Sequence, residues 1–310
     1  MNYSEPYWKN NIPGNFLIGN PYDLSKDMIS SIEFFDTLQE VPADAWDISR
    51  SSGTVMAWVI PDGMGKFRLS VGACGGINAC FCEGMFADYT EVEYIHFRGC
   101  FHTDYATSMS GMFENCSMID YLDLSDFVTV NVTSLYSMFR DCQSLDYLDL
   151  RSFDTRNVVD MQMMFTDCFC ITELDLSSFR TGKVTDMSFM FDGCCSLTDL
   201  HFCFDTTNVT DMTRMFCGCS FLETISLRSF STSNTVNMCC MFFGCNDLVE
   251  ADISSFDFSS VRITDSMFAH CESLENIGVS ELNLPETVDT THMFSGCCKL
   301  NVKVPGKQVD

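Results

Sequence analysis

Carboxylates at regular intervals are the first feature of this sequence that could do chemistry. Aspartates recur at one position of a repeated segment, and the series is interrupted at His201, Ser226 and Gly278. Its members are Asp123, Asp149, Asp175 and Asp252. Stacked carboxylates repel one another, so a calcium ion or a basic partner would relieve them, although water and salt can also screen them. Because the series lacks the oxygen cage of a calcium loop, we name no metal or cofactor site.

Tyrosines accompany these carboxylates. Tyr121 and Tyr147 stand two residues before aspartates of the series, and Asp120 and Asp146 add charge next to them. In an extended strand such positions share the outward face. We therefore expect a candidate ligand face made of Asp120, Tyr121, Asp123, Asp146, Tyr147, Asp149 and Asp175.

Nineteen cysteines would ordinarily suggest disulfides or zinc. Eight of them form one column: Cys116, Cys142, Cys168, Cys194, Cys219, Cys245, Cys271 and Cys297. Parallel stacking points their side chains the same way, so we expect buried free thiols that pack as small hydrophobes. One cysteine per unit also does not supply paired zinc ligands. Less regular cysteines could oxidise or bind metal: Cys80 with Cys82, and the adjacent pairs Cys194–Cys195, Cys239–Cys240 and Cys297–Cys298.

Nothing in the sequence groups residues for catalysis. The five histidines share no column, and no Ser/His/Asp or Cys/His arrangement emerges. These histidines are His96, His102, His201, His270 and His292. We therefore predict that the protein is not an enzyme and name no catalytic residue.

The charge balance restricts the partners. Against 43 Asp+Glu the chain has 17 Lys+Arg, a formal net charge of -26. Such a field repels nucleic acid and anionic lipid and attracts cations and basic protein patches, although it can equally serve solubility alone. No apolar run approaches the roughly 18 residues that span a bilayer, and no secretory signal or anchor is visible. We expect no nucleic-acid partner, no membrane insertion and a monomer.

These residues are positioned by a repeat of about 26 residues. Met-Phe pairs recur 25 to 27 residues apart, beginning at Met85, Met112, Met138, Met164, Met190, Met215, Met241, Met267 and Met293. Aromatic residues form another column at Phe127, Phe153, Phe179, Phe204, Phe230 and Phe256, and valines at Val132, Val158, Val184, Val209, Val236 and Val261. One unit cannot bury its own apolar positions, so stacked coils must place each column on its copies.

Each unit has two kinds of local pattern. The segment that begins at Tyr121, YLDLS, alternates with a period of two and predicts a strand, and its copies must run parallel. Val184, Met187 and Met190 are spaced as on a helix and predict one or two helical turns on the opposite side. Asn131 is expected in a turn, where its side chain can bond its own backbone.

The ends depart from the repeat. Residues 1–84 are expected to form a non-repeat cap, with Trp8, Phe16, Phe34, Phe35 and Trp46 as its packing residues and two strands around the turn 61–65. The array then spans 85–304, and 305–310 form a tail.

The repeated units resemble the bacterial surface-protein repeat of 26 residues, which is allied to the BspA-like leucine-rich repeats. The likeness covers about residues 52–304, with units such as MFDGCCSLTDLHFCFDTTNVTDMTR. It implies a leucine-rich-repeat-like solenoid and an exported protein of the cell surface, often linked to adhesion. It brings no catalytic residues.

Together these patterns predict an α/β fold: a leucine-rich-repeat-like solenoid of about eight to nine units, with a parallel sheet on one face, short helical turns on the other and an N-terminal cap. The predicted function is a non-enzymatic surface or interaction scaffold that binds protein or glycan ligands through the strand face. The alternative is a structural spacer or assembly subunit with no specific ligand.

Overall fold

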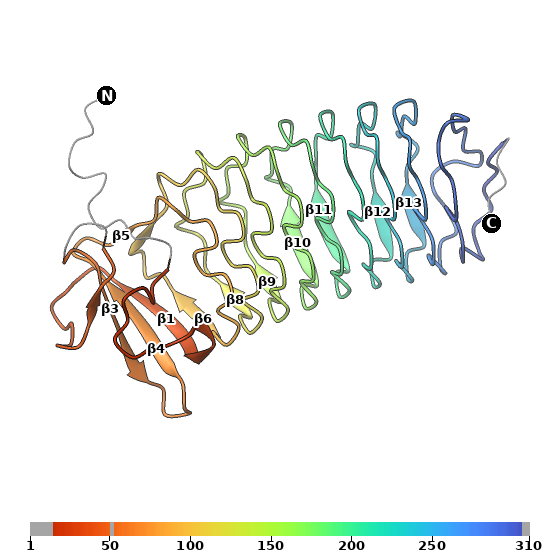
Figure 1. The fold of residues 1–310 in the computed structure, drawn as a ribbon. Helices are drawn as coiled ribbons and strands as arrows, with labels where there is room; N and C mark the ends of the chain where they lie inside the picture. The colour runs from red at the N-terminus through yellow and green to blue at the C-terminus, as the bar shows by residue number, and fades with distance from the viewer. Residues whose placement is uncertain (1–14, 50–52, 306–310) are drawn as a thin grey trace, which may run out of the picture.

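The chain forms a row of stacked coils that extends from a small N-terminal sheet (Figure 1). A computed structural model describes residues 15–49 and 53–305. Trp8 of the expected cap lies outside these ranges, as do residues 306–310 of the expected tail.

Turns and loops make up most of the described residues, and the regular elements are mainly short strands. The 3-10 helix η2 spans Lys26–Met28. The strands are β1 (Ile29–Phe35), β2 (Trp46–Asp47), β3 (Met56–Pro61), β4 (Phe67–Gly72), β5 (Ile77–Asn78), β6 (Tyr94–His96), β7 (Phe101–His102), β8 (Tyr121–Leu122), β9 (Tyr147–Leu148), β10 (Glu173–Leu176), β11 (Asp199–Phe202), β12 (Thr224–Ser226) and β13 (Glu250–Asp252).

The N-terminal sheet has the order β2-β3-β4-β1-β6. β3 and β4 pair antiparallel around the turn that the sequence predicts, and β1 lies parallel to both β4 and β6. Phe16, Phe34 and Trp46 of the expected cap are buried. The rings of Phe16 and Phe34 pack 5.3 Å and 6.1 Å from Phe86, the first phenylalanine of the Met-Phe pairs. β6 belongs to the first coil and is also the edge strand of this sheet, so the sheet continues directly into the coils. The expected boundary between cap and array after residue 84 stays a prediction.

Successive coils stack in parallel, one repeat apart. Tyr121 pairs with Tyr147 and Glu173 with Asp199 on the strand side. A second line of parallel bridges runs along the array through Ser108, Ser134, Asp160, Asp186, Asp211, Asn237, Ile263 and Asp289. The predicted parallel sheet is therefore present as two-stranded pieces, β8-β9, β10-β11 and β12-β13. This arrangement is a solenoid-like repeat fold.

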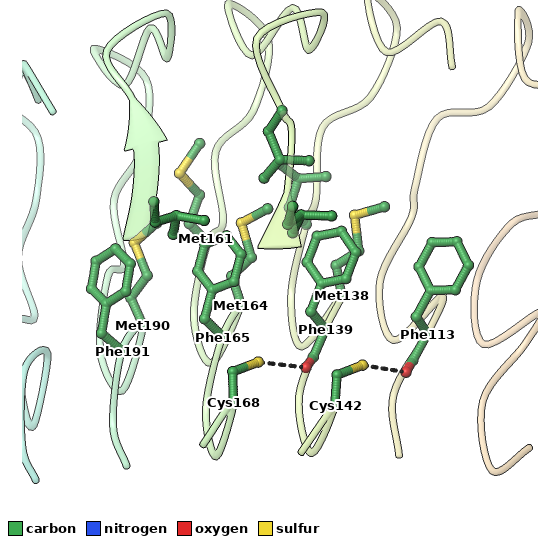
Figure 2. Close-up of a cluster of buried hydrophobic side chains, with 14 of the residues drawn as sticks. Phe113, Met138, Phe139, Cys142, Met161, Met164, Phe165, Cys168, Met190 and Phe191 are labelled. Atoms are coloured by element: carbon green, nitrogen blue, oxygen red, sulfur yellow. Dashed lines mark hydrogen bonds between the residues drawn. The ribbon is translucent and has the colours of Figure 1, made fainter. Parts of the chain in front are cut away.

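The phenylalanines of the Met-Phe pairs form a continuous internal stack, as predicted. From Phe86 to Phe294, neighbouring ring centroids are 5.1 to 5.7 Å apart and the rings are within 2 to 9° of parallel. The methionines of the pairs are fully buried beside them (Figure 2). Equivalent side chains thus lie directly over one another, which lets each coil bury apolar area that it could not bury alone.

The column cysteines are free, and all but the half-buried Cys297 are buried, as predicted. Each thiol donates to the carbonyl oxygen of the phenylalanine one coil earlier, for example from Cys142 Sγ to Phe113 at 3.1 Å and from Cys168 Sγ to Phe139 at 3.1 Å (Figure 2). All 19 cysteines lie within the described residues, and all are free.

The predicted helical turns are wrong. Every second N–H of this side bonds to the next coil, as Phe189 does to Thr213 at 2.8 Å. The N–H groups between them close four-residue β-turns, as Met190 does onto Met187 at 3.3 Å. Left-handed backbone at Phe189 (φ 60) and Gly193 (φ 76) prevents a helix from continuing. Consecutive β-turns also space apolar side chains three and four apart, so the pattern alone did not distinguish them from a helix.

Polar columns run between the coils as well. Buried threonines form one at Thr103, Thr129, Thr155, Thr181, Thr206 and Thr232. Most of these hydroxyls donate to a carbonyl oxygen of the next coil and accept the N–H of that same residue, as Thr129 does with Asp154 at 3.2 Å and 2.7 Å. Asn131 donates to the carbonyl oxygen of Asp104 in the preceding coil at 3.0 Å, so the expected bond to its own turn is wrong.

One member of the predicted valine column is wrong. Val236 is 43% exposed, and the buried Thr235 takes its place in the column.

Candidate functional site

Two tyrosine rings stack on the outer face of β8 and β9. Tyr121 and Tyr147 are directly paired across the strands and are 51% and 55% exposed. Their ring centroids are 6.2 Å apart with an interplanar angle of 15°. The alternation of the strand turns Leu122 and Leu148 inward, where both are buried. The apolar side of each strand therefore fixes the tyrosines on the opposite face.

Three carboxylates continue this face along the array, and each accepts hydrogen bonds from the residue two positions further on. Ser125 donates to Asp123 from its N–H at 3.1 Å and its hydroxyl at 2.7 Å. The N–H of Ser177 donates to Asp175 at 3.0 Å. These bonds lower the pKa of both carboxyl groups.

Arg151 holds the third carboxylate. Its Nε and Nη2 donate to Asp149 at 2.9 Å and 2.6 Å, and its backbone N–H donates at 3.0 Å. These hydrogen bonds lower the pKa of Asp149 to about 2. The carboxylates are therefore ionised at neutral pH. Each is also stabilised by donors of its own coil, so no calcium ion is needed to keep them charged.

Asp120 and Asp146 lie at the entrance to the two strands. Both are exposed, and the backbone N–H of Asp146 donates to the carbonyl oxygen of Asp120 at 3.2 Å. The structure thus brings the predicted residues of coils β8 and β9 together on one surface. Asp175 joins them from β10, where the charges of Asp175 and Arg151 interact.

A shallow groove follows the tyrosines. One hollow of about 460 Å³ is lined by both tyrosines, Asp123, Asp149 and Arg151. A second hollow of about 510 Å³ shares Tyr121 and Asp123 with the first and extends toward β6. We call the two together the tyrosine groove, lined by Tyr94, His96, Arg98, Asp120, Tyr121, Asp123, Asp126, Tyr147, Asp149 and Arg151.

Sequence reasoning missed the part of the groove that β6 supplies. Tyr94 lies 27 residues before Tyr121, and His96 stands where later units have the aspartate of the carboxylate series. The rings of Tyr94 and His96 are in contact at 4.6 Å. The same column spacing could have revealed both residues, but Tyr89 replaces the column cysteine in the first unit and obscures its register.

The groove offers aromatic faces bordered by negative charge. Partial burial and the nearby carboxylates of Asp123 and Asp149 raise the pKa of Tyr121, so its hydroxyl stays protonated. Such a surface attracts cations, which bind over tyrosine rings and pair with carboxylates. Further along the face, Glu173, Asp199 and His201 bring their ligand atoms within 4.8 Å of one another, and all three are exposed.

Among the described residues, no helix has the length and apolar character needed to cross a membrane. This finding concerns the helices of residues 15–49 and 53–305 alone.

The comparison with family profiles agrees with a repeated architecture. The profile of a family described as "Mycoplasma protein of unknown function, DUF285" matches residues 107–202 and 199–306, two tandem segments of the coil region. The family name differs from the 26-residue surface-protein repeat to which the units were likened. Comparison with curated proteins finds no match. The crystal structure of a leucine rich cell surface protein from Faecalibacterium prausnitzii A2-165 is similar over 85% of this chain and 95% of that chain, at 14% sequence identity and a TM-score of 0.32.

Proposed function

This chain belongs to the family of Mycoplasma proteins of unknown function, DUF285, and we propose that it is a non-enzymatic repeat scaffold that binds a basic protein surface through the tyrosine groove. The observation that carries this proposal is the exposed parallel stack of Tyr121 and Tyr147 beside ionised carboxylates. Large exposed aromatic rings cost free energy in water unless a partner covers them, and they are enriched at binding surfaces.

Charge favours a cationic partner. The formal net charge of the chain is -26, so a basic surface is attracted from a distance and its approach is accelerated. A lysine or arginine over an exposed tyrosine ring contributes about 0.5–1 kcal/mol. Arg98 and Arg151 also line the groove, but each pairs with a carboxylate, Arg98 with Glu33 at 2.8 Å and Arg151 with Asp149 at 2.6 Å, so their charges are compensated.

The proposal includes a location at the cell surface, because the repeat units resemble those of bacterial surface proteins. A glycan is the other ligand class that stacks on tyrosine rings. The charge does not favour a neutral sugar over a basic peptide, so we propose the protein ligand and keep the glycan as an outcome of the test.

The test is selection of a random displayed peptide library on the immobilised whole chain. We expect enrichment of peptides that contain several Lys or Arg, and loss of their binding as salt is raised. The double variant Tyr121→Ala/Tyr147→Ala should weaken the enriched peptides at least tenfold. Tyr105→Ala is the matched control, since it removes a tyrosine that is 40% exposed but lies outside the groove.

Three results would overturn the proposal. Equal binding by the double variant and the control would remove the groove as the binding surface. Enrichment of glycans but not peptides on parallel arrays would assign the groove to a sugar. No enrichment of either class would favour a structural spacer.

A further inference from the structure

Two adjacent thiols and a carboxylate meet on the side of the array that carries the β-turns. Cys239 and Cys240 belong to one coil and Asp265 to the next, and their ligand atoms all lie within 4.8 Å of one another. Cys239 Sγ is 3.6 Å from Cys240 Sγ and 3.9 Å from Asp265 Oδ2. All three side chains are half-buried, so they are screened from bulk water but reachable by a small ion.

These separations suit a tetrahedral metal ion. With Zn–S bonds of about 2.3 Å and Zn–O bonds of about 2.0 Å, a tetrahedron has edges of about 3.8 Å between sulfurs and about 3.5 Å between sulfur and oxygen. The observed distances of 3.6 Å and 3.9 Å lie close to these edges. Zinc accepts both thiolate and carboxylate ligands, whereas calcium and magnesium prefer oxygen alone.

The backbone holds the three donors in place. The N–H of Cys240 donates to the carbonyl oxygen of Asp265 at 2.9 Å, and the carbonyl oxygen of Cys239 accepts the N–H of Arg214 at 2.9 Å. The same bonds recur in the coils from Met85 to Met267, including those without such a cluster, so they do not depend on a bound ion. Little ordering of the chain would be required on binding, which favours affinity.

The sequence places this combination at one step of the array. Cys239 and Asp265 occupy the same column, two residues before the methionine of their Met-Phe pairs. Neighbouring side chains in this column are in contact, as Gln162 Nε2 and Ser188 Oγ are at 2.8 Å. In the other coils from Met112 onward the column holds Ser110, Tyr136, Gln162, Ser188, Thr213 and Thr291. Only at Cys239 does a second thiol follow directly and a carboxylate stack on top.

The surroundings leave the donors available. Arg214, the nearby cation, is held by Asp192 through bonds of 2.9 Å and 3.1 Å, so its charge is compensated. Burial and the hydrogen bond with Cys240 raise the pKa of Cys239. A metal ion must displace thiol protons, so its affinity should increase with pH.

We propose that Cys239, Cys240 and Asp265 bind one zinc ion that clamps two adjacent coils together. The ion joins the coil of Met241 to the coil of Met267, and it acts independently of the tyrosine groove on the opposite side. Its effect is to stabilise one step of the array.

The test is a zinc titration of the reduced, metal-free whole chain, followed by calorimetry and by thermal unfolding. We expect one tight equivalent of zinc and a rise in Tm that a chelator reverses. Cobalt in place of zinc should give the charge-transfer absorption of a cobalt–thiolate bond. Cys240→Ser and Asp265→Asn should each weaken zinc binding at least tenfold, with unchanged circular dichroism of the metal-free protein.

Cys195→Ser is the matched control, since Cys195, like Cys240, directly follows another cysteine and is half-buried. It should leave the tight equivalent intact. The proposal fails if both cluster variants keep that equivalent, or if Cys195→Ser loses as much affinity as they do. It also fails if zinc binds without raising Tm.

Discussion

Replacing Thr155 by valine changes one hydroxyl for a methyl group and leaves the side-chain shape almost unchanged. Thr155 is 1% exposed, and its Oγ1 donates to the carbonyl oxygen of Arg180 at 3.3 Å and accepts the N–H of Arg180 at 2.7 Å. An unsatisfied buried donor costs about 1–3 kcal/mol, and the weakened carbonyl bond costs about 0.5–1.5 kcal/mol. Burial of the extra methyl returns roughly 1 kcal/mol. We therefore expect the free energy of unfolding to fall by about 2 kcal/mol.

Serine at the same position makes the opposite change, because it removes the methyl group and not the hydroxyl. Thr155→Ser keeps the hydroxyl and loses one methyl group, which costs roughly 1 kcal/mol. The expected order of stability is threonine, then serine, then valine, whereas a purely apolar site would prefer valine to serine. Thr198→Val is the matched control. Its exposed hydroxyl donates to Thr172 at 3.1 Å, and its loss should change stability by no more than about 0.5 kcal/mol.

The assays are urea unfolding followed by circular dichroism and native-state hydrogen exchange at Arg180. The exchange measurement gives a local reading, because stacked coils need not unfold in a single step. The Arg180 amide should exchange faster in Thr155→Val than in Thr155→Ser. The reasoning is refuted if valine is as stable as serine, or if the Arg180 amide exchanges at the same rate in both.

Two further predictions concern the apolar interior. Phe165→Ala removes a fully buried ring that is stacked on both sides and should lower the free energy of unfolding by about 4 kcal/mol. Phe294→Ala, at the end of the stack, should lower it by less. Equal losses in urea unfolding would contradict a continuous stack. Burial raises the pKa of the Cys116 thiol to about 12, so the unfolded chain loses this proton first and stability should fall as pH rises from about 9. Cys116→Ala should make that fall shallower by about 1.4 kcal/mol per pH unit, and an unchanged slope would show that the thiol does not ionise on unfolding.

Much of the candidate ligand face could be predicted from the sequence. Tyr121 and Tyr147 alternate with leucines, and alternation in a strand separates the two faces whatever the rest of the chain does. The contribution of Tyr94 and His96 was missed, since the first coil departs from the repeat and only the pairing of β1 with β6 shows its place. The bond from Arg151 to Asp149 was not predicted either, because spacing does not reveal which way a long side chain turns.

The sequence alone determined which side chains share a column. A spacing of 25 to 27 residues repeats the same packing problem in each coil, so the phenylalanines and cysteines must lie on their copies. Only the tertiary structure decided where the polar groups go. The N–H of Phe189 and the side chains of Thr155 and Asn131 all find partners about one coil away, and no local pattern encodes a partner at that distance. The helical turns were predicted from local spacing, and they are replaced by β-turns because bonds between coils satisfy the backbone that a helix would have satisfied within itself.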